Sequence, residues 1–194
     1  DIALSELTCA PVHFCHISTR ESVEAIRQAK KRGVKVTCET APHYFTLTDE
    51  DVKGYNANFK MNPPLRSKED RQAIIQGLID GTIDLIASDH APHSVLDKDM
   101  EFDRAAFGIV GLETSLSLSL KLVHDGFLTM KELVNKMAKY PAKIIGINND
   151  IKPGNIADLT IIDLDRVYEI TPETFKSKSQ NTPFSGQKVR GSAF

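Results

Sequence analysis

The feature that most constrains this chain is a short apolar run that stops abruptly in charged and histidine residues. The run Leu85–Ala87 is followed by Asp89, His90 and His93, with Pro92 among them. Pro92 disfavours a helix at this point, because proline lacks a backbone N–H group and restricts the residue before it. The run therefore predicts a buried strand whose carboxyl end carries a carboxylate and two imidazoles.

Two earlier segments end in the same way. Val12–Ser18 is a β-type run that carries His16, and Val34–His43 is a second run that ends in His43. Short strands that alternate with helical segments indicate βαβ units and a parallel sheet. Since the carboxyl ends of parallel strands lie at one edge of a sheet, we expect these two histidines to lie close to Asp89.

Helix-start signals divide the rest of the chain. Ser18 and Glu21 have the spacing of a capping box before a helix over 21–31, and Ser67 is the expected N-cap of a helix over 68–80. A strand end closed by two prolines is expected over 58–66, which would complete about four βα units. Further elements are expected as helices over 112–123, 130–139 and 141–145 and as a strand of a separate sheet over 156–164.

His16, His43 and Asp89 are candidate ligands of a divalent metal ion. Neutral imidazole and carboxylate together suit zinc or a similar ion. Such an ion would lower the pKa of a bound water toward ~7, and Asp89 could take a proton from that water and pass it to a leaving nitrogen. His13 and His124 are interpreted as structural, because His13 lies on the opposite strand face and His124 falls in the last turn of a helix.

Two other groups are candidates for substrate binding. Pro92 holds His93 on a loop that faces the same edge of the sheet. Asn62 and Arg66 flank a pair of prolines, and they either fasten a loop or offer an amide and a guanidinium to a carboxylate substrate. The chain has no glycine-rich phosphate motif, which disfavours nucleotide binding.

Composition narrows the classes of function further. The chain has 194 residues, 41% of them hydrophobic and 26% charged, as in an ordinary globular protein. The net charge of −2 gives no reason to expect a nucleic acid or an anionic membrane as partner. No apolar run approaches the ~18–20 residues that span a bilayer. Three cysteines are interpreted as small buried residues in a reducing environment, so we expect a cytoplasmic protein.

Six motifs carry a resemblance to a known family. They are His16–Thr19, Ala41–Tyr44, Lys60–Ser67, Asp80–Asp84, Ala87–His93 and Phe107–Thr114. Together they resemble the bacterial class I dihydroorotases, which are cyclic-amide hydrolases of pyrimidine biosynthesis in the amidohydrolase superfamily. The resemblance covers essentially the whole chain, and the motifs Lys60–Ser67 and Ala87–His93 separate dihydroorotases from the related allantoinases and hydantoinases.

The resemblance implies a fold and a reaction. The fold would be α/β, with residues 1–152 forming the C-terminal half of a (β/α)8 TIM-type barrel and residues 153–194 beginning a small β-sandwich domain. The reaction would be the reversible cyclisation of N-carbamoyl-L-aspartate to L-dihydroorotate, with two zinc ions in an intact active site. His16 and His43 would bind one zinc, and Asp89 would bind the other and act as the catalytic acid and base. The implied substrate contacts are Asn62, His93 and the main chain at Phe107 and Gly108.

The chain departs from the family pattern in an informative way. Ala41, Tyr44 and Ser88 are mild departures from the commoner residues of the motifs. The family's His-x-His metal pair and its metal-bridging residue are absent. We therefore expect the chain to be a fragment that is inactive alone, and that its partners are the missing N-terminal half of the same protein and a second copy in a homodimer. The first and last strands of a half barrel would otherwise be long, unpaired edges.

Two other functions compete with dihydroorotase. One is an allantoinase or hydantoinase acting on a different cyclic ureide, against which His93 and Asn62 argue. The other is a non-catalytic dihydroorotase-like module that serves assembly with another enzyme. The retained His16, His43 and Asp89 speak against that loss of catalysis, while the absent ligands keep it open.

Overall fold

A three-stranded parallel sheet lies at the centre of the computed structural model, which describes all residues from 1 to 194. Its strands are β1 (Val12–Phe14), β2 (Val36–Thr40) and β3 (Leu85–Ile86), in the order β1-β2-β3. Both pairs of neighbouring strands are parallel. The α/β class and the parallel sheet are therefore confirmed.

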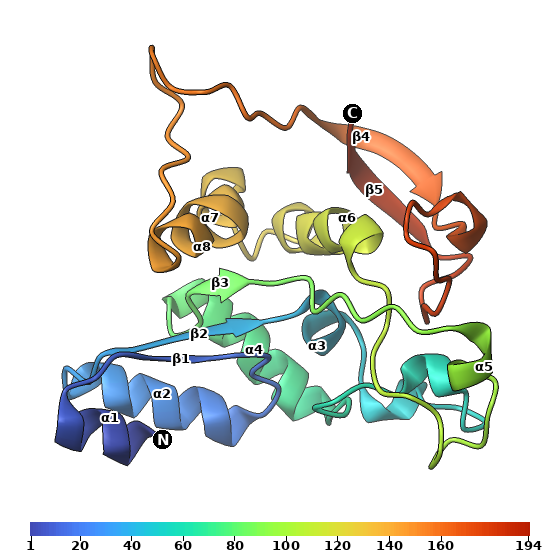
Figure 1. Ribbon diagram of the computed structural model, residues 1–194, viewed down its shortest axis with the longest axis horizontal. Coiled ribbons are helices and arrows are strands. Elements are labelled where there is room, and N and C mark those ends of the chain that lie inside the picture. The colour runs from blue at the N-terminus through green and yellow to red at the C-terminus, as the bar shows by residue number, and fades with distance from the viewer.

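Helices surround this sheet on two sides (Figure 1). α1, α2 and α4 lie along one side of it, and α6, α7 and α8 lie beyond β3. The helices are α1 (Ile2–Thr8), α2 (Arg20–Lys31), α3 (Pro42–Thr46), α4 (Lys68–Asp80), α5 (Val95–Lys98), α6 (Leu112–His124), α7 (Met130–Val134) and α8 (Tyr140–Ile144). Short 3-10 turns occur at Asp49–Asp51, Ala57–Phe59 and Pro172–Thr174, and a π-helical turn, Asn135–Lys139, joins α7 to α8.

The core forms where α2 and α4 cover one face of β2. Val36 and Cys38 point to that face and are buried, as are Val23 and Ile26 on α2. A spacing of three places the two α2 residues on one side of the helix. Burial of each of the three aliphatic side chains among these contributes about 1.5–3 kcal/mol, so this interface stabilises the sheet.

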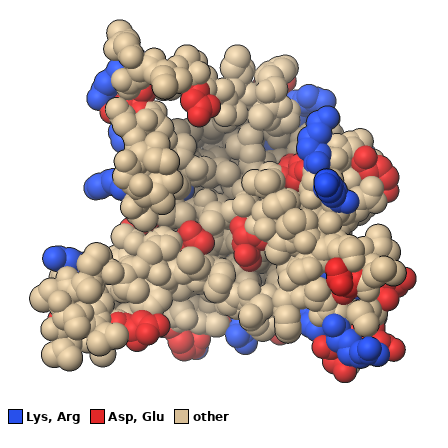
Figure 2. All heavy atoms as spheres, in the orientation of Figure 1, with Lys and Arg blue, Asp and Glu red and all other residues tan.

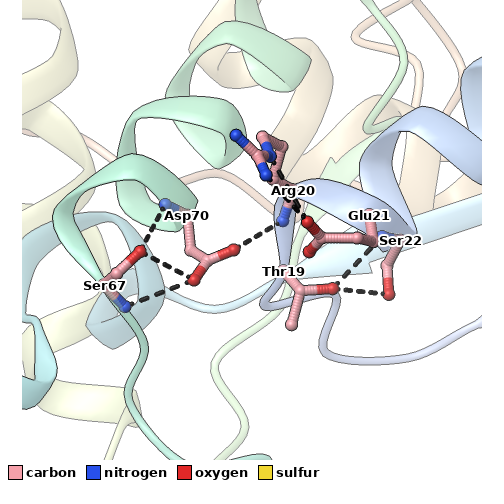
Figure 3. A network of polar contacts seen from close by, with 6 residues as sticks. All are labelled: Thr19, Arg20, Glu21, Ser22, Ser67 and Asp70. Atoms are coloured by element: carbon pink, nitrogen blue, oxygen red, sulfur yellow. Dashed lines mark hydrogen bonds and ion pairs between the residues drawn. The ribbon is translucent and has the colours of Figure 1, made fainter.

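The N-termini of α2 and α4 are tied together by side chains (Figure 3). Ser67 caps α4, and its hydroxyl donates to Asp70 in a capping box, 2.9 Å. The other oxygen of Asp70 accepts from the backbone N–H of Arg20, 2.8 Å, which joins the two helix starts. The N-cap of α2 is Thr19, whose hydroxyl oxygen accepts from the backbone N–H of Ser22.

A second sheet packs against α6. It contains β4 (Ile162–Glu169) and β5 (Lys188–Ala193), which run antiparallel. Gly191 allows the close approach, because a Cβ at this position would lie 2.3 Å from Leu120 Cδ1 of α6. The seven buried residues of this second core are Met61, Leu65, Ile109, Leu118, Ile170, Phe184 and Val189. The domain boundary expected near residue 153 stays a prediction.

Several local predictions were wrong. No strand forms over 58–66, where a 3-10 turn leads into irregular chain, and the parallel sheet has three strands instead of four. The edge strands β1 and β3 contain only three and two residues, so the long unpaired edges expected of a half barrel are not present. The segment expected as one helix over 130–139 is α7 followed by the π-helical turn.

The prediction that the cysteines are buried holds only for Cys38. Cys9 and Cys15 are exposed, and all three thiols are free. On the face shown in Figure 2, basic and acidic side chains are interspersed, and neither sign forms a continuous field. None of the helices combines the length and the apolar character that crossing a membrane requires.

Candidate metal and substrate site

The three candidate metal ligands all follow strands of the parallel sheet. His16 lies two residues after β1, His43 lies in the first turn of α3 directly after β2, and Asp89 lies three residues after β3. The backbone continues the sheet here, because the N–H of Ile17 donates to Glu39 and the N–H of Ala87 donates to Thr40. The three residues therefore follow neighbouring strand ends at one edge of the sheet, and their sharing of a metal ion stays a prediction.

His43 faces Asp89 from a buried position. Its side chain is 2% exposed, and Nε2 lies 3.4 Å from Asp89 Oδ2. Burial lowers the pKa of His43, because it disfavours the imidazolium, although the carboxylate of Asp89 opposes this effect. The contact with His43 lowers the pKa of Asp89, and a positive charge on His16 would lower both values. The site therefore favours neutral His43 beside ionised Asp89, which are the protonation states that ligate a metal.

The backbone at two of these residues is unusual. His16 has φ of 42° and Asp89 has φ of 46°, in the left-handed region that non-glycine residues rarely adopt. Each such conformation costs about 1–2 kcal/mol and persists only where the surrounding structure enforces it. Strain at two strand ends that meet at one edge is typical of a functional site.

The donor set fits a divalent cation. Nε2 of His43 is buried and has no hydrogen-bond partner, so a polar atom points into the site unsatisfied. A buried polar atom without a partner costs about 1–3 kcal/mol, and a metal ion would remove that cost. Asp89 supplies a carboxylate 3.4 Å from it, and His16 supplies an imidazole at the end of the neighbouring strand; both side-chain types are zinc ligands.

His90 has a structural position beside this site. Its Nδ1 accepts from the backbone N–H groups of Gly111 and Leu112, at 3.2 and 3.3 Å. These groups begin α6, where the helix leaves N–H groups without partners. His90 thus fastens the chain after β3 to α6.

His93, Phe107 and Gly108 lie together, as expected from the sequence. His93 Nε2 donates to the carbonyl oxygen of Phe107, 2.7 Å. The backbone N–H of Gly108 donates to the carbonyl of Lys60, 3.0 Å, which brings the 60–66 segment to the same place. The N–H of Phe107 makes no hydrogen bond within the protein.

Asn62 lies on that 60–66 segment and is exposed. The next residue, Pro63, accepts a hydrogen bond from the hydroxyl of Tyr44, 2.7 Å, and Tyr44 follows His43 directly. Arg66 is exposed. Burial raises the pKa of the Tyr44 hydroxyl, and the positive charge of Arg66 opposes this effect. The structure thus places both candidate side chains on one short segment fastened beside His43.

Sequence reasoning missed two buried residues of the site. Lys98 and Asn181 hold the chain around Gly108 through hydrogen bonds to backbone carbonyls. Asn181 also accepts from the backbone N–H of His93, 3.2 Å. Neither residue belongs to a recognisable sequence motif, and a single lysine in a polar loop gives no sign that it is buried.

A second polar cluster lies beside His16, on the sheet face opposite the buried Val36 and Cys38. His13 is hydrogen-bonded to Thr37 at 2.8 Å and to Glu39 at 3.2 Å, as expected of a structural histidine. Ligand atoms of His13, Cys15 and Glu39 lie within 4.8 Å of one another, close enough to share a metal ion. Both ring nitrogens of His13 already have hydrogen-bond partners. We therefore interpret this cluster as a structural hydrogen-bond network and not as a metal site.

The fold and the site together define a class of protein. The chain belongs to the Amidohydrolase family, whose model matches residues 2–191. This agrees with a parallel sheet that carries histidine and aspartate at its carboxyl edge.

The curated proteins most similar to this chain include several dihydroorotases. The chain is 64% identical over 191 residues to a dihydroorotase of Desulforapulum autotrophicum, covering 98% of this chain and 45% of that protein. It thus spans about half the length of the curated relatives it matches.

Solved structures share the fold. The L-hydantoinase (dihydropyrimidinase) from Arthrobacter aurescens matches 99% of this chain and 44% of its own, with a TM-score of 0.93 and 34% identity. The inactive dihydroorotase-like domain of a Chaetomium thermophilum CAD-like multifunctional protein matches 98% of this chain and 50% of its own, with a TM-score of 0.72. At 23% identity, the latter shows the fold alone.

Proposed function

We propose that the protein containing this chain is a dihydroorotase, which cyclises N-carbamoyl-L-aspartate to L-dihydroorotate reversibly in the cytoplasm. The observation that carries the proposal is the buried Nε2 of His43, which makes no hydrogen bond and faces Asp89 Oδ2 at 3.4 Å. The identity of 64% to a dihydroorotase supports the choice of substrate.

His16, His43 and Asp89 would hold zinc, with two ions in the complete site. A divalent cation there supplies Lewis-acid polarisation of the amide carbonyl. In the hydrolytic direction Asp89 takes a proton from the attacking water and returns it to the ring nitrogen as the amide bond breaks. In the cyclising direction the same carboxylate removes the proton from the attacking nitrogen.

The substrate would lie beside the 60–66 and 107–108 segments, which are joined by the hydrogen bond from Gly108 to Lys60. Asn62 offers an amide, and His93 offers its free Nδ1, since Nε2 is committed to Phe107. Phe107 has an unpaired backbone N–H that can bind a substrate carboxylate. Gly108 uses its N–H and its carbonyl within the protein, so its part is to allow close packing: a Cβ there would lie 2.4 Å from Ala91 Cβ.

We also propose that further strands of the complete barrel cover the polar face of the sheet, and that the complete protein forms a homodimer. The half-buried His13, Thr37 and Glu39 lie on that face, and Glu39 borders a hollow between the sheet and α6. The chain alone is then expected to be inactive, since three ligands leave the second metal incompletely bound.

A hydantoinase activity is the second candidate, and the TM-score of 0.93 to the Arthrobacter aurescens enzyme favours it. The test is a substrate panel on the complete natural polypeptide, loaded with zinc, with dihydroorotate, hydantoin and allantoin as substrates. Selective hydrolysis of dihydroorotate supports the proposal, and preference for hydantoin or allantoin contradicts it. Stoichiometric zinc without any turnover would indicate a non-catalytic module.

A further inference from the structure

We propose that Lys98 is a positioning residue that fixes the Phe107 loop, and through it His93, for the substrate. This inference rests on the proposed function, which gives His93 and Phe107 their substrate. Lys98 itself makes hydrogen bonds only to backbone carbonyls.

Lys98 is a buried cation surrounded by backbone carbonyls. Its side chain comes from the end of α5, and the residue is 7% exposed. Nζ donates to the carbonyls of Ala106 at 2.9 Å, Gly108 at 3.0 Å and Lys60 at 3.3 Å. An ammonium group has three donors, so the three carbonyls satisfy it completely.

Two of the three carbonyls belong to the residues on either side of Phe107 in the chain. Ala106 and Gly108 flank Phe107, so Lys98 holds the backbone immediately before and after that residue. With both neighbours fixed, the Phe107 carbonyl points to His93 Nε2 and its N–H stays free. Lys98 therefore sets the orientation of the His93 ring, because the hydrogen bond at one ring nitrogen determines where the other points.

Neighbouring groups reinforce this arrangement. Asn181 Nδ2 donates to the Gly108 carbonyl at 3.2 Å and to the Ala91 carbonyl at 3.1 Å. Lys60 donates to the carbonyl of Asp103, and its Nζ lies 4.3 Å from the centre of the Phe107 ring. A cation over an aromatic face is attractive, so the Phe107 side chain is held as well as its backbone.

Burying the charged ammonium group of Lys98 costs free energy, and we expect its hydrogen bonds to offset that cost. Desolvation, with a smaller effect of Lys60, lowers the pKa of Lys98 to about 8 from its ordinary 10.5. A methionine of similar length would fill the same space without that cost. A lysine here is thus explained by what its donors hold in place.

The test compares Lys98→Met with wild type in the complete natural polypeptide. Lys178→Met is the matched control, because Lys178 is exposed and lines the same hollow beside α5. We expect Lys98→Met to raise the KM for dihydroorotate about tenfold or more with a smaller change in kcat, at unchanged zinc content. Unchanged KM in a folded variant would overturn the inference.

Hydrogen exchange tests the same inference without measuring activity. The backbone N–H groups of Ala106, Gly108 and Val110 are all hydrogen-bonded, to Asp97, Lys60 and Asn181 respectively. We expect these amides to exchange at least about a hundredfold more slowly than in an unfolded chain, before substrate is added. Lys98→Met should accelerate them and leave β2 unchanged. Fast exchange in wild type would overturn the role of Lys98 even if the enzyme is a dihydroorotase. Absent turnover with slow exchange would reject only the proposed function.

Discussion

Replacing Gly111 by alanine should lower the stability of the protein and disturb the proposed metal site. Gly111 begins α6 at the point where this helix meets the chain after β3. A Cβ at this position would lie 2.2 Å from the carbonyl oxygen of Ser88 and 3.6 Å from His90 Cα. The first distance is about 1.2 Å shorter than the 3.4 Å at which ordinary contact begins.

The neighbouring atoms belong to the backbone, so no side-chain rotation can relieve this overlap. Overpacking of this kind typically costs about 1–3 kcal/mol, and a rigid neighbour places Gly111→Ala at the upper end, near 3 kcal/mol. The chain between Ser88 and His90 must move to make room. Asp89 lies in that stretch in a left-handed conformation, so its carboxylate should leave its place opposite His43.

Gly126→Ala is the matched control, at the other end of α6. Gly126 has a φ of +78° and nothing within 4 Å of its Cβ position, so alanine there meets conformational strain alone, about 1 kcal/mol. Urea unfolding gives the free energies, and zinc analysis gives the metal content. Gly111→Ala should lose stability and zinc, while Gly126→Ala should lose only stability. Wild-type stability or full zinc in Gly111→Ala would refute the reasoning.

Four further predictions follow from single residues. Asp89→Asn should keep the fold, checked by circular dichroism, and lower turnover of dihydroorotate about a thousandfold, because proton transfer and metal binding both weaken; near-normal rates would exclude its proposed role. Asp70→Ala should cost about 1–2 kcal/mol in urea unfolding, since it removes the tie between α2 and α4; a neutral result would mean that the tie is weak. Burial raises the pKa of Cys38 to about 12, so a thiol reagent should label it only after denaturation, and labelling of the native protein would contradict its burial. The pKa of Lys98 falls from 10.5 to about 8 on folding, so the unfolded chain binds more protons between these values. The stability of wild type relative to Lys98→Met should therefore increase from pH 8 to pH 10.5, and a flat difference would contradict the shift.

Where the signals are local, the sequence predicted the fold well. Helix α4 begins and ends as expected, because Ser67 supplies a capping box and Gly81 takes the left-handed position that ends a helix. At α2 two adjacent hydroxyl residues compete as N-cap. Ser18 is buried, and Thr19 is the N-cap of α2. Which of the two residues caps the helix depends on tertiary packing, which the local sequence pattern does not show.

The missing strand over 58–66 has a physical cause. Pro63 and Pro64 have no N–H groups to donate, so that segment cannot pair within a sheet. The length of an element was also hard to predict. β3 is only two residues long, and 25 residues that include α5 separate it from α6.

The candidate site also has parts that the sequence predicts and parts that it does not. The positions of His16, His43 and Asp89 after neighbouring strands could be predicted, because topology alone brings the ends of parallel strands to one edge. The contributions of Lys98 and Asn181 could not. Asn181 reaches Ala91 across 90 positions of sequence, and no pattern of neighbours announces such a contact.

The left-handed backbone of His16 and Asp89 has an evolutionary consequence. At these two positions the requirements of folding oppose those of the proposed catalysis, since glycine or asparagine would relax the chain there and remove the proposed ligands. In a duplicated gene freed from selection for turnover, substitutions at these two codons would be favoured rather than merely tolerated. Loss of activity in a lineage should therefore be recorded first at these two positions, before the core of the protein begins to change.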